Sequence, residues 1–185
     1  MQTTSIYIEL VIIGAEVCTW VFTIFALIDD RVVSLLKNGL SSIPMAIILL
    51  GLCYVVGVVF DRIADWIFKK YEVKIRDSIK IPEHIVTSHL FLLKDKEYLD
   101  SHVSRKRIIR GTAINVLPIS IALAVYLLVH HLSIAIAIAV LVCGFVFCTL
   151  CLVAHYQILK SFFKRAKRYI ESEKEEDSAP ADDAE

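Results

Sequence analysis

The sequence has few residues that would interrupt a helix, because glycine occurs six times and proline four times in 185 positions. It also lacks the short motifs of common enzymes, since no Walker A, HExxH or GxSxG pattern occurs in it. We therefore expect no enzymatic activity, no cofactor and no metal site. Each of the five cysteines lies inside an apolar run, which excludes a disulfide-stapled secreted domain.

Charged residues are scarce in four long stretches of the chain. Hydrophobic residues make up 57% of the sequence, above the roughly 45–50% of soluble domains. Each stretch has about 18 residues or more, enough to cross ~30 Å of hydrocarbon as a helix. The expected spans are 6–28, 43–60, 112–129 and 133–159. Because backbone groups in lipid must pair within their own segment, we predict an all-α integral membrane protein with four transmembrane helices.

Lys and Arg residues are segregated along the chain. Twelve of the 20 lie in 61–110 and six in 160–185, whereas the connection after the first span holds only Arg31 and Lys37. The positive-inside rule then predicts that both termini and the segment 61–110 are cytoplasmic. No Lys or Arg precedes the first span, so we expect an uncleaved helix rather than a signal peptide. The expected location is a bacterial inner membrane, and the lipid bilayer is the first expected partner.

The segment 61–110 is predicted to be an ordered helical hairpin, because it lacks glycine until its end and Pro82 is its one proline. Apolar residues recur at a spacing of four, at Ile63, Ile67, Tyr71 and Ile75. This spacing predicts that the second span continues as a helix with one apolar face to about residue 80. Pro82 should end that helix and begin a second one. A third helix is expected from about Lys96 directly into the third span.

The C-terminal part changes character along its length. Residues 160–169 are basic and amphipathic, which predicts a helix at the membrane interface. Residues 171–185 hold eight acidic residues, one Lys and Pro180, a composition typical of a disordered tail. The predicted organisation is therefore transmembrane helices in 1–60, a cytoplasmic helical segment in 61–110, transmembrane helices in 111–159 and a basic, then acidic, cytoplasmic tail in 160–185.

Four basic residues stand at the edge of the third span, namely Arg105, Lys106, Arg107 and Arg110. One interpretation is a topology anchor on anionic headgroups, at about 1 kcal/mol per residue. The other is an anion site: in an oligomer such clusters would surround one axis and bind a nucleotide or oligonucleotide regulator. No aromatic residue is interleaved with the cluster, so base stacking has no support there.

Two acidic residues lie inside the first span. Glu16 is about ten residues into it, or ~15 Å deep, where a carboxylate is costly unless it is paired, hydrated or protonated. Glu9 and Thr23 lie seven residues before and after it, so the three share one helix face. In a symmetric oligomer this stripe would line a cation path, to which Asn115 of the third span would contribute.

A structural role for the same residues is the alternative. Glu16 would then be hydrogen-bonded to Asn115 or Ser120 on a neighbouring helix. Glu9 would pair with Arg62 or Arg110 at the inner boundary of the membrane. The residue pattern does not decide between a path and a structural role.

Other residues of the spans predict packing and bending. Pro118 removes a helix hydrogen bond in the third span, and a hinge there would connect the basic cluster to movement in the membrane. Ala135 and Ala139 have the small-xxx-small spacing of close helix contacts, within the chain or between subunits. Gly51 and Gly57 are expected to serve the second span in the same way.

One catalytic pattern is present only in half. Gly57, Asp61 and Asp65 fit GxxxDxxxD, which resembles the second half of the CDP-alcohol phosphotransferase signature. The aspartates and arginine of the first half are missing upstream, so four acidic ligands become two. We interpret Asp61 and Asp65 as a carboxylate pair one helical turn apart at the inner boundary.

The stretches 54–65 and 104–111 occur within this four-helix plan, and together they resemble the small membrane subunits of bacterial anti-phage defence systems, such as the Hailong channel subunit and the Kiwa membrane subunit. The resemblance implies a homo-oligomer, such as a homotetramer, that depolarises the membrane or senses its damage. It also implies regulation by a cytosolic partner protein or a nucleotide-like ligand.

Two functions follow as expectations. The first is an oligomeric channel-like effector of the inner membrane, regulated from the cytoplasm and acting in antiviral defence by depolarisation. The alternative is a non-conducting scaffold or sensor that docks a cytosolic partner enzyme through residues 61–110. A transporter is disfavoured, because the two hairpins differ in length and polarity and show no repeat.

Overall fold

The computed structural model describes residues 2–29, 31–34, 42–79 and 96–178, and all regular structure in these ranges is helical. The long helices are α1 (Gln2–Ile28), α3 (Ile43–Ile79), α6 (Lys96–Val129) and α7 (Ile134–Ser178). Each contains a stretch long and apolar enough to cross a membrane. The prediction of an all-α protein with four apolar helices compatible with transmembrane spans is therefore confirmed.

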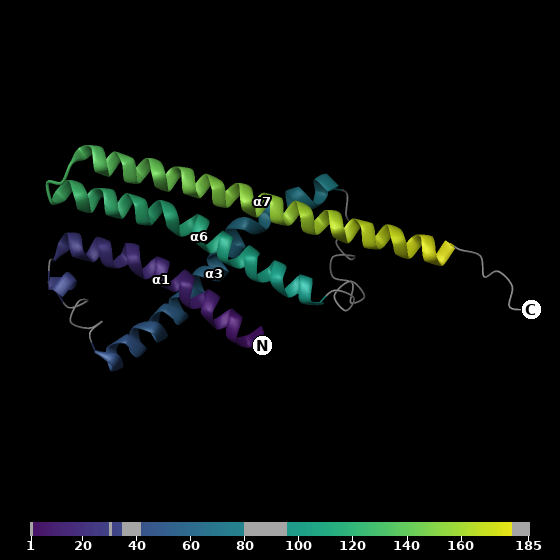
Figure 1. Ribbon diagram of the computed structural model, residues 1–185, viewed down its shortest axis with the longest axis horizontal. Coiled ribbons are helices and arrows are strands. Elements are labelled where there is room, and N and C mark those ends of the chain that lie inside the picture. Colours follow the sequence, from purple (N-terminus) through teal and green to yellow (C-terminus); the bar gives the residue numbers. More distant parts are fainter. Residues whose placement is uncertain (1, 30, 35–41, 80–95, 179–185) are drawn as a thin grey trace, which may run out of the picture.

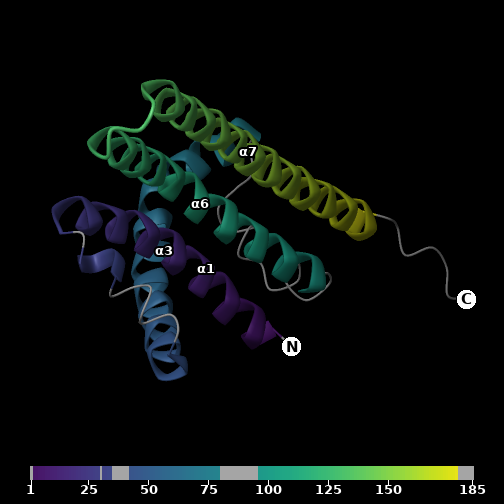
Figure 2. The ribbon, with the colours of Figure 1, turned by 60° about the vertical axis from the view of Figure 1, so that its left-hand side comes forward.

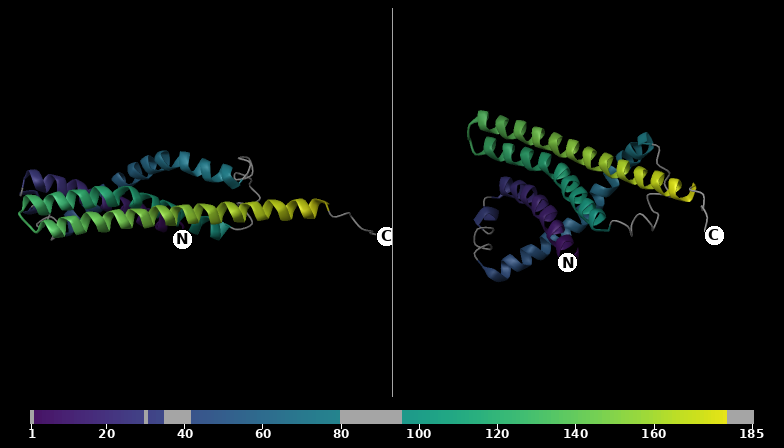
Figure 3. Two further views of the ribbon diagram at one scale, coloured as in Figure 1. Left: turned by 90° about the horizontal axis from the view of Figure 1, so that it is seen from above. Right: turned by 45° about the vertical axis from the view of Figure 1, so that its right-hand side comes forward.

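The helices α6 and α7 form an antiparallel hairpin and lie side by side along most of α6 (Figure 1). Their turn is tight: the amide of Leu132 donates to the carbonyl of Leu127 at 2.9 Å, and His131 has φ of 55° in the left-handed region. The helix α1 lies on the other side of α6 (Figure 2). The helix α3 crosses one face of this layer obliquely (Figure 2), and the view from above in Figure 3 shows its later part to one side of the layer. Pro118 lies inside α6, which runs on through it and changes direction part-way along its length (Figure 3).

Glycines set the crossing of α1 and α3. A Cβ on Gly57 would lie 1.9 Å from the carbonyl oxygen of Leu10, and one on Gly14 would lie 1.6 Å from that of Cys53. Only hydrogen fits at either position, so the two backbones approach as they do in small-residue contacts of membrane helices. Gly57 was expected to pack in this way, whereas its partner Gly14 was not singled out.

The other predicted packing residues make no such contact within the described ranges. There, a Cβ on Gly51 would meet nothing within 4 Å, and both Ala135 and Ala139 are exposed. The helix α7 instead turns Ala137 and Gly144 toward α6, and a Cβ on Gly144 would lie 1.9 Å from the hydroxyl oxygen of Ser120. Use of Ala135 and Ala139 in contacts between subunits stays a prediction.

Three helices extend well beyond their apolar stretches. As predicted, α3 continues to Ile79 and α6 begins at Lys96; the expected break at Pro82 and the helix after it lie outside the described residues. The predicted interfacial helix at 160–169 is a direct continuation of α7, and the disordered tail predicted from 171 is helical to Ser178. Residues 160–178 contain no Gly or Pro and are rich in helix-forming Lys, Arg and Glu, which favours one unbroken helix.

The extensions of α3 and α7 pack on each other through a small apolar core. Ile75 of α3 meets Leu159, Phe162, Phe163 and Ala166 of α7. Of the apolar face predicted for α3, only Ile75 is buried; Ile63, Ile67 and Tyr71 are exposed, and Ala64 and Phe68 are buried instead. Those three face away because the Gly14–Gly57 crossing fixes the rotation of α3, and the buried face continues from Gly57 through Ala64 and Phe68.

Candidate functional site: a charged junction of three helices

Arg110 lies at the centre of a cluster of charged side chains where α6 meets α3. Its side chain is only 5% exposed. Nη2 donates to Oδ1 of Asp61 at 2.8 Å and Nη1 donates to Oδ1 of Asp65 at 2.5 Å. The two carboxylates stand one turn apart on α3, which allows one planar guanidinium to bridge them. Charge-assisted hydrogen bonds of this kind are roughly twice as strong as neutral ones.

Arg107 connects the same cluster to α1. Its Nη1 donates to Oε2 of Glu9 at 2.9 Å, and its Nε lies 3.5 Å from Oδ2 of Asp61. The other oxygen of Glu9 accepts a hydrogen bond from the hydroxyl of Ser104 at 2.5 Å. Glu9 is therefore paired at the boundary of the apolar stretch, but with Arg107 rather than with Arg62 or Arg110.

Lys106 of α6 completes the cluster two turns beyond Asp65 of α3, where its Nζ donates to Oε2 of Glu72 at 2.6 Å. We call these seven residues the charged junction: Glu9, Asp61, Asp65, Glu72, Lys106, Arg107 and Arg110. Four carboxylates thus surround three cations. The junction ties α1, α3 and α6 together where the apolar stretch of α3 ends and that of α6 begins.

The four basic residues predicted as an anion site are separated by this arrangement. Lys106, Arg107 and Arg110 face carboxylates of α1 and α3. Arg105 is exposed and makes no ion pair within the described part of the chain; it lines a groove between α6 and α7. An anion at the cluster would therefore meet one available guanidinium, not four.

Glu16 faces α6 at the middle of the predicted span. Its Oε1 accepts from the hydroxyl of Thr112 at 2.7 Å, and its Oε2 accepts from Nδ2 of Asn115 at 3.2 Å. Asn115 is 1% exposed, whereas the hydroxyl of Ser120 donates to the carbonyl of Val116. Within the described ranges no Lys or Arg forms an ion pair with Glu16. The carboxylate is thus held by neutral donors alone.

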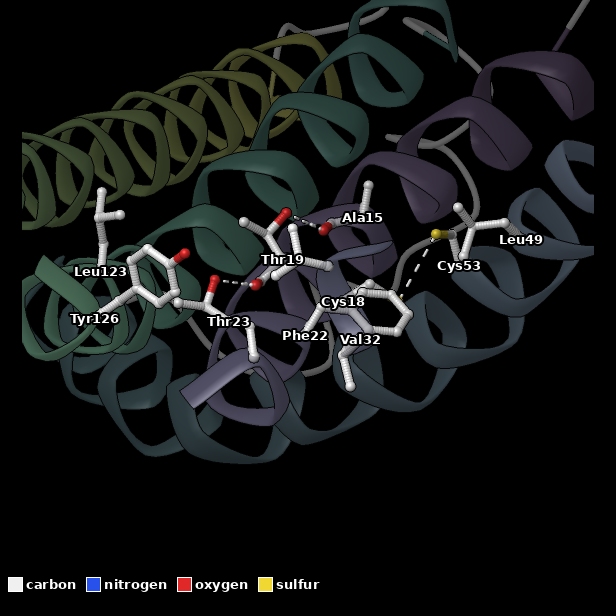
Figure 4. Close-up of a pocket in the computed structure, with 12 residues that line it drawn as sticks. Ala15, Cys18, Thr19, Phe22, Thr23, Val32, Leu49, Cys53, Leu123 and Tyr126 are labelled. Carbon is white, nitrogen blue, oxygen red and sulfur yellow. Dashed lines mark hydrogen bonds between the residues drawn. The ribbon is translucent and has the colours of Figure 1, made fainter. Parts of the chain in front are cut away.

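Thr23, the third member of the predicted stripe, lies apart from the two glutamates. Its hydroxyl donates to the carbonyl of Thr19 at 2.7 Å. Both threonines line a mostly apolar cavity of about 660 Å³ between α1, α3 and α6 (Figure 4). Cys18 and Cys53 line it too, with their sulfur atoms 3.8 Å apart. The structure therefore brings Glu9, Glu16 and Asn115 to the contact of α1 with α6, and Thr23 to a cavity wall.

Some residues of this region were missed in the sequence. Glu72 lies seven residues after Asp65, so it falls on the same face of α3 as Asp61 and Asp65. This spacing would have identified Glu72 as a further member of the cluster. His155 is fully buried in α7, its ring centroid 4.7 Å from that of Phe68. A histidine inside an otherwise apolar stretch was the available signal for it. Cys151 lies four residues before His155, but this spacing did not indicate a hydrogen-bond partner for the imidazole.

Comparison with protein families, curated proteins and solved structures finds no match to this chain. Among the described residues no group of His, Cys, Asp or Glu is placed to hold a metal ion. A function therefore has to come from the geometry of the junction. The resemblance to anti-phage membrane subunits stays a prediction.

Proposed function

We propose that this chain is a multi-pass membrane sensor or scaffold that couples the packing of its helices in the bilayer to the position of cytoplasmic helices that dock a partner protein. This is the second of the two functions expected from the sequence. The observation that carries it is Arg110, buried between two carboxylates of α3. A buried guanidinium in this position resists separation of α3 from α6, because separation would leave opposite charges unpaired.

The level of the junction supports this proposal. Asp61 directly follows the apolar stretch of α3, and Arg110 comes just before that of α6. By the positive-inside rule this level is the cytoplasmic surface of the membrane, with both termini on the same side. A change in bilayer thickness alters the tilt of membrane helices. Because the ion pairs of the junction join α1, α3 and α6, a change in the tilt of one of these helices would move the others.

Continuous helices would carry such a change outward. The helix α3 runs from the apolar stretch through Asp61 to Ile79, and α7 runs without a break to Ser178. Their extensions meet at the core around Ile75 and Phe162. The extension of α3 also leaves Trp66 77% exposed, together with other apolar side chains, beside charged ones. We propose this exposed surface of 61–79 as part of the docking region for a cytosolic partner.

The test is a distance measurement on the full chain. Spin labels are placed at positions 70 and 164, on exposed Lys residues of α3 and α7, after the five cysteines are replaced by alanine. The protein is reconstituted in vesicles of short-chain and of long-chain phosphatidylcholine. We expect the label distance to differ between the two bilayers, and this difference to disappear in Arg110→Gln but not in Arg62→Gln. Equal distances in both bilayers would overturn the proposal.

An oligomeric channel is the second candidate, and Glu16 favours it. A carboxylate near the middle of a span, held by the neutral Thr112 and Asn115, remains available to attract a cation. In this proposal a homo-oligomer, such as a tetramer, opens under control of a cytosolic partner or nucleotide and depolarises a bacterial inner membrane.

Ion flux separates the two candidates. Vesicles containing the wild-type chain, Glu16→Gln or Thr112→Val are compared, and oligomeric mass is measured on the same samples. Flux that is lost in Glu16→Gln while the oligomer persists supports the channel. Absence of flux in all three, with the bilayer-dependent label distance retained, supports the non-conducting sensor.

A further inference from the structure

A polar groove of about 390 Å³ lies between α6 and α7, apart from the charged junction. Its polar lining comes from Ser101, His102 and Arg105 of α6 and from Gln157 and Ser161 of α7, with two apolar residues of α7 completing the wall. His102 stacks on Phe162, ring centroids 4.4 Å apart, which fixes one side of the groove. The site is thus formed by two packed helices and not by a loop.

The side chains of this groove suit an anion with several oxygen atoms. Arg105 supplies a guanidinium with five N–H donors, the two serines supply hydroxyls, and Gln157 supplies an amide. Among the described side chains, no carboxylate lines the groove. The junction carboxylates Glu72, Glu9 and Asp61 instead contact Lys106, Arg107 and Arg110. Of the four basic residues, Arg105 is therefore the one whose charge no described carboxylate neutralises.

The groove also lies at headgroup level. Arg105 precedes the apolar stretch of α6 by seven residues, or about 10 Å along a helix. Gln157 and Ser161 stand on either side of the point where the apolar stretch of α7 ends. Phosphate groups of phospholipids occupy this depth, and basic residues there attract anionic lipids.

We propose that the groove binds the phosphate group of an anionic phospholipid, with Arg105 as its principal contact. Ser101, Gln157 and Ser161 would hydrogen-bond the remaining phosphate oxygens. A zwitterionic lipid is disfavoured, because its ammonium group would approach the same guanidinium. The site requires only that the chain spans a bilayer, so it stands whether the protein senses, docks or conducts.

The experiment titrates purified full-length protein in detergent and counts bound molecules by native mass spectrometry. The probes are phosphatidylglycerol, phosphatidylcholine, inorganic phosphate and ATP, each used alone. Arg105→Gln removes the charge and Arg105→Lys keeps it without the planar fork. Arg62→Gln is the matched control, because Arg62 is exposed on α3 and the same charge is lost. A melting curve on each variant verifies folding.

We expect phosphatidylglycerol to bind more tightly than phosphatidylcholine. Arg105→Gln should weaken its affinity by about tenfold or more, Arg105→Lys should weaken it less, and Arg62→Gln should change it by less than about twofold. If inorganic phosphate or ATP depends on Arg105 and phosphatidylglycerol does not, a lipid is the wrong occupant. Equal weakening in Arg105→Gln and Arg62→Gln would overturn the site itself, because only net charge would then matter.

Discussion

Arg110 of α6 and Asp61 of α3 are 49 positions apart in the sequence, yet Nη2 of the arginine lies 2.8 Å from Oδ1 of the aspartate. The same guanidinium reaches Asp65, and Arg107 brings Glu9 of α1 into the cluster. Helices that cross in lipid gain little from the hydrophobic effect, because the lipid is as apolar as the side chains. Ion pairs at the membrane boundary therefore provide much of what aligns α1, α3 and α6.

Removal of Arg110 should be destabilising. Arg110→Gln removes the cation that Asp65 contacts and leaves Asp61 with Arg107. Because the Asp65 side chain is 55% exposed and Asp61 keeps one partner, we expect a loss of about 1–3 kcal/mol, less than for a fully buried pair. Arg62→Gln removes the same charge from the exposed surface of α3 and should cost less than about 0.5 kcal/mol. The measurement is the free energy of unfolding in detergent.

A double-mutant cycle tests whether Arg110 acts through Asp61. Arg110→Gln together with Asp61→Asn should be less destabilised than the sum of the two single variants, because either single substitution already removes the interaction between these two side chains. Additive losses would contradict the ion pair between these two residues.

Gly57 and Gly51 form a matched pair for testing the crossing of α1 and α3. Gly57→Ala would place a methyl group 1.9 Å from the carbonyl oxygen of Leu10, so the helices must separate. We expect a loss of about 2 kcal/mol from this overpacking. Among the described residues Gly51→Ala meets open space and, by helix propensity, it should be neutral or stabilising by up to about 1 kcal/mol. Similar melting temperatures for the two variants would place the crossing elsewhere.

The sequence was sufficient for the four apolar helices and for much of their length. Hydropathy is summed over 18 or more residues, so single exceptions such as Glu16 do not obscure it. Gly57 and Gly51 show where this kind of reasoning stops. Both are glycines of one span six residues apart, and only the position of α1 decides which of them is in contact.

The partners of the charged residues could not be derived from the sequence for a related reason. Arg107 and Arg110 lie three residues apart and both were available to Glu9; the rotation and height of α6 against α1 select Arg107. The length of α7 was misjudged because an acidic composition was taken to indicate disorder. Up to Ser178 the same Glu and Lys residues are good helix formers that continue a packed helix.

Cys18 and Cys53 provide a chemical test of the contact between α1 and α3. Their sulfur atoms are 3.8 Å apart and a disulfide needs about 2 Å, so a small side-chain movement suffices. Iodine in detergent should oxidise the two thiols to one intrachain disulfide, releasing two protons and two iodide ions. Peptide mapping after alkylation is expected to show this bridge in the wild-type chain and not in Cys18→Ala. A bridge from Cys18 to any other cysteine would contradict the helix arrangement.

His155 is expected to lower stability rather than to support it. The residue is 0% exposed, and in the described part of the chain neither ring nitrogen has a hydrogen-bond partner. A buried polar group without partners costs about 1–3 kcal/mol, while its ring still packs edge-on against Phe68. His155→Leu should therefore raise the free energy of unfolding by about 1–2 kcal/mol. A destabilised variant would instead indicate a buried water on the imidazole, since such waters are costly to remove. A third outcome is a stabilised variant in which the label distance between positions 70 and 164 stops responding to bilayer thickness. That result would show that the imidazole couples the membrane helices to the cytoplasmic ones, at the expense of stability.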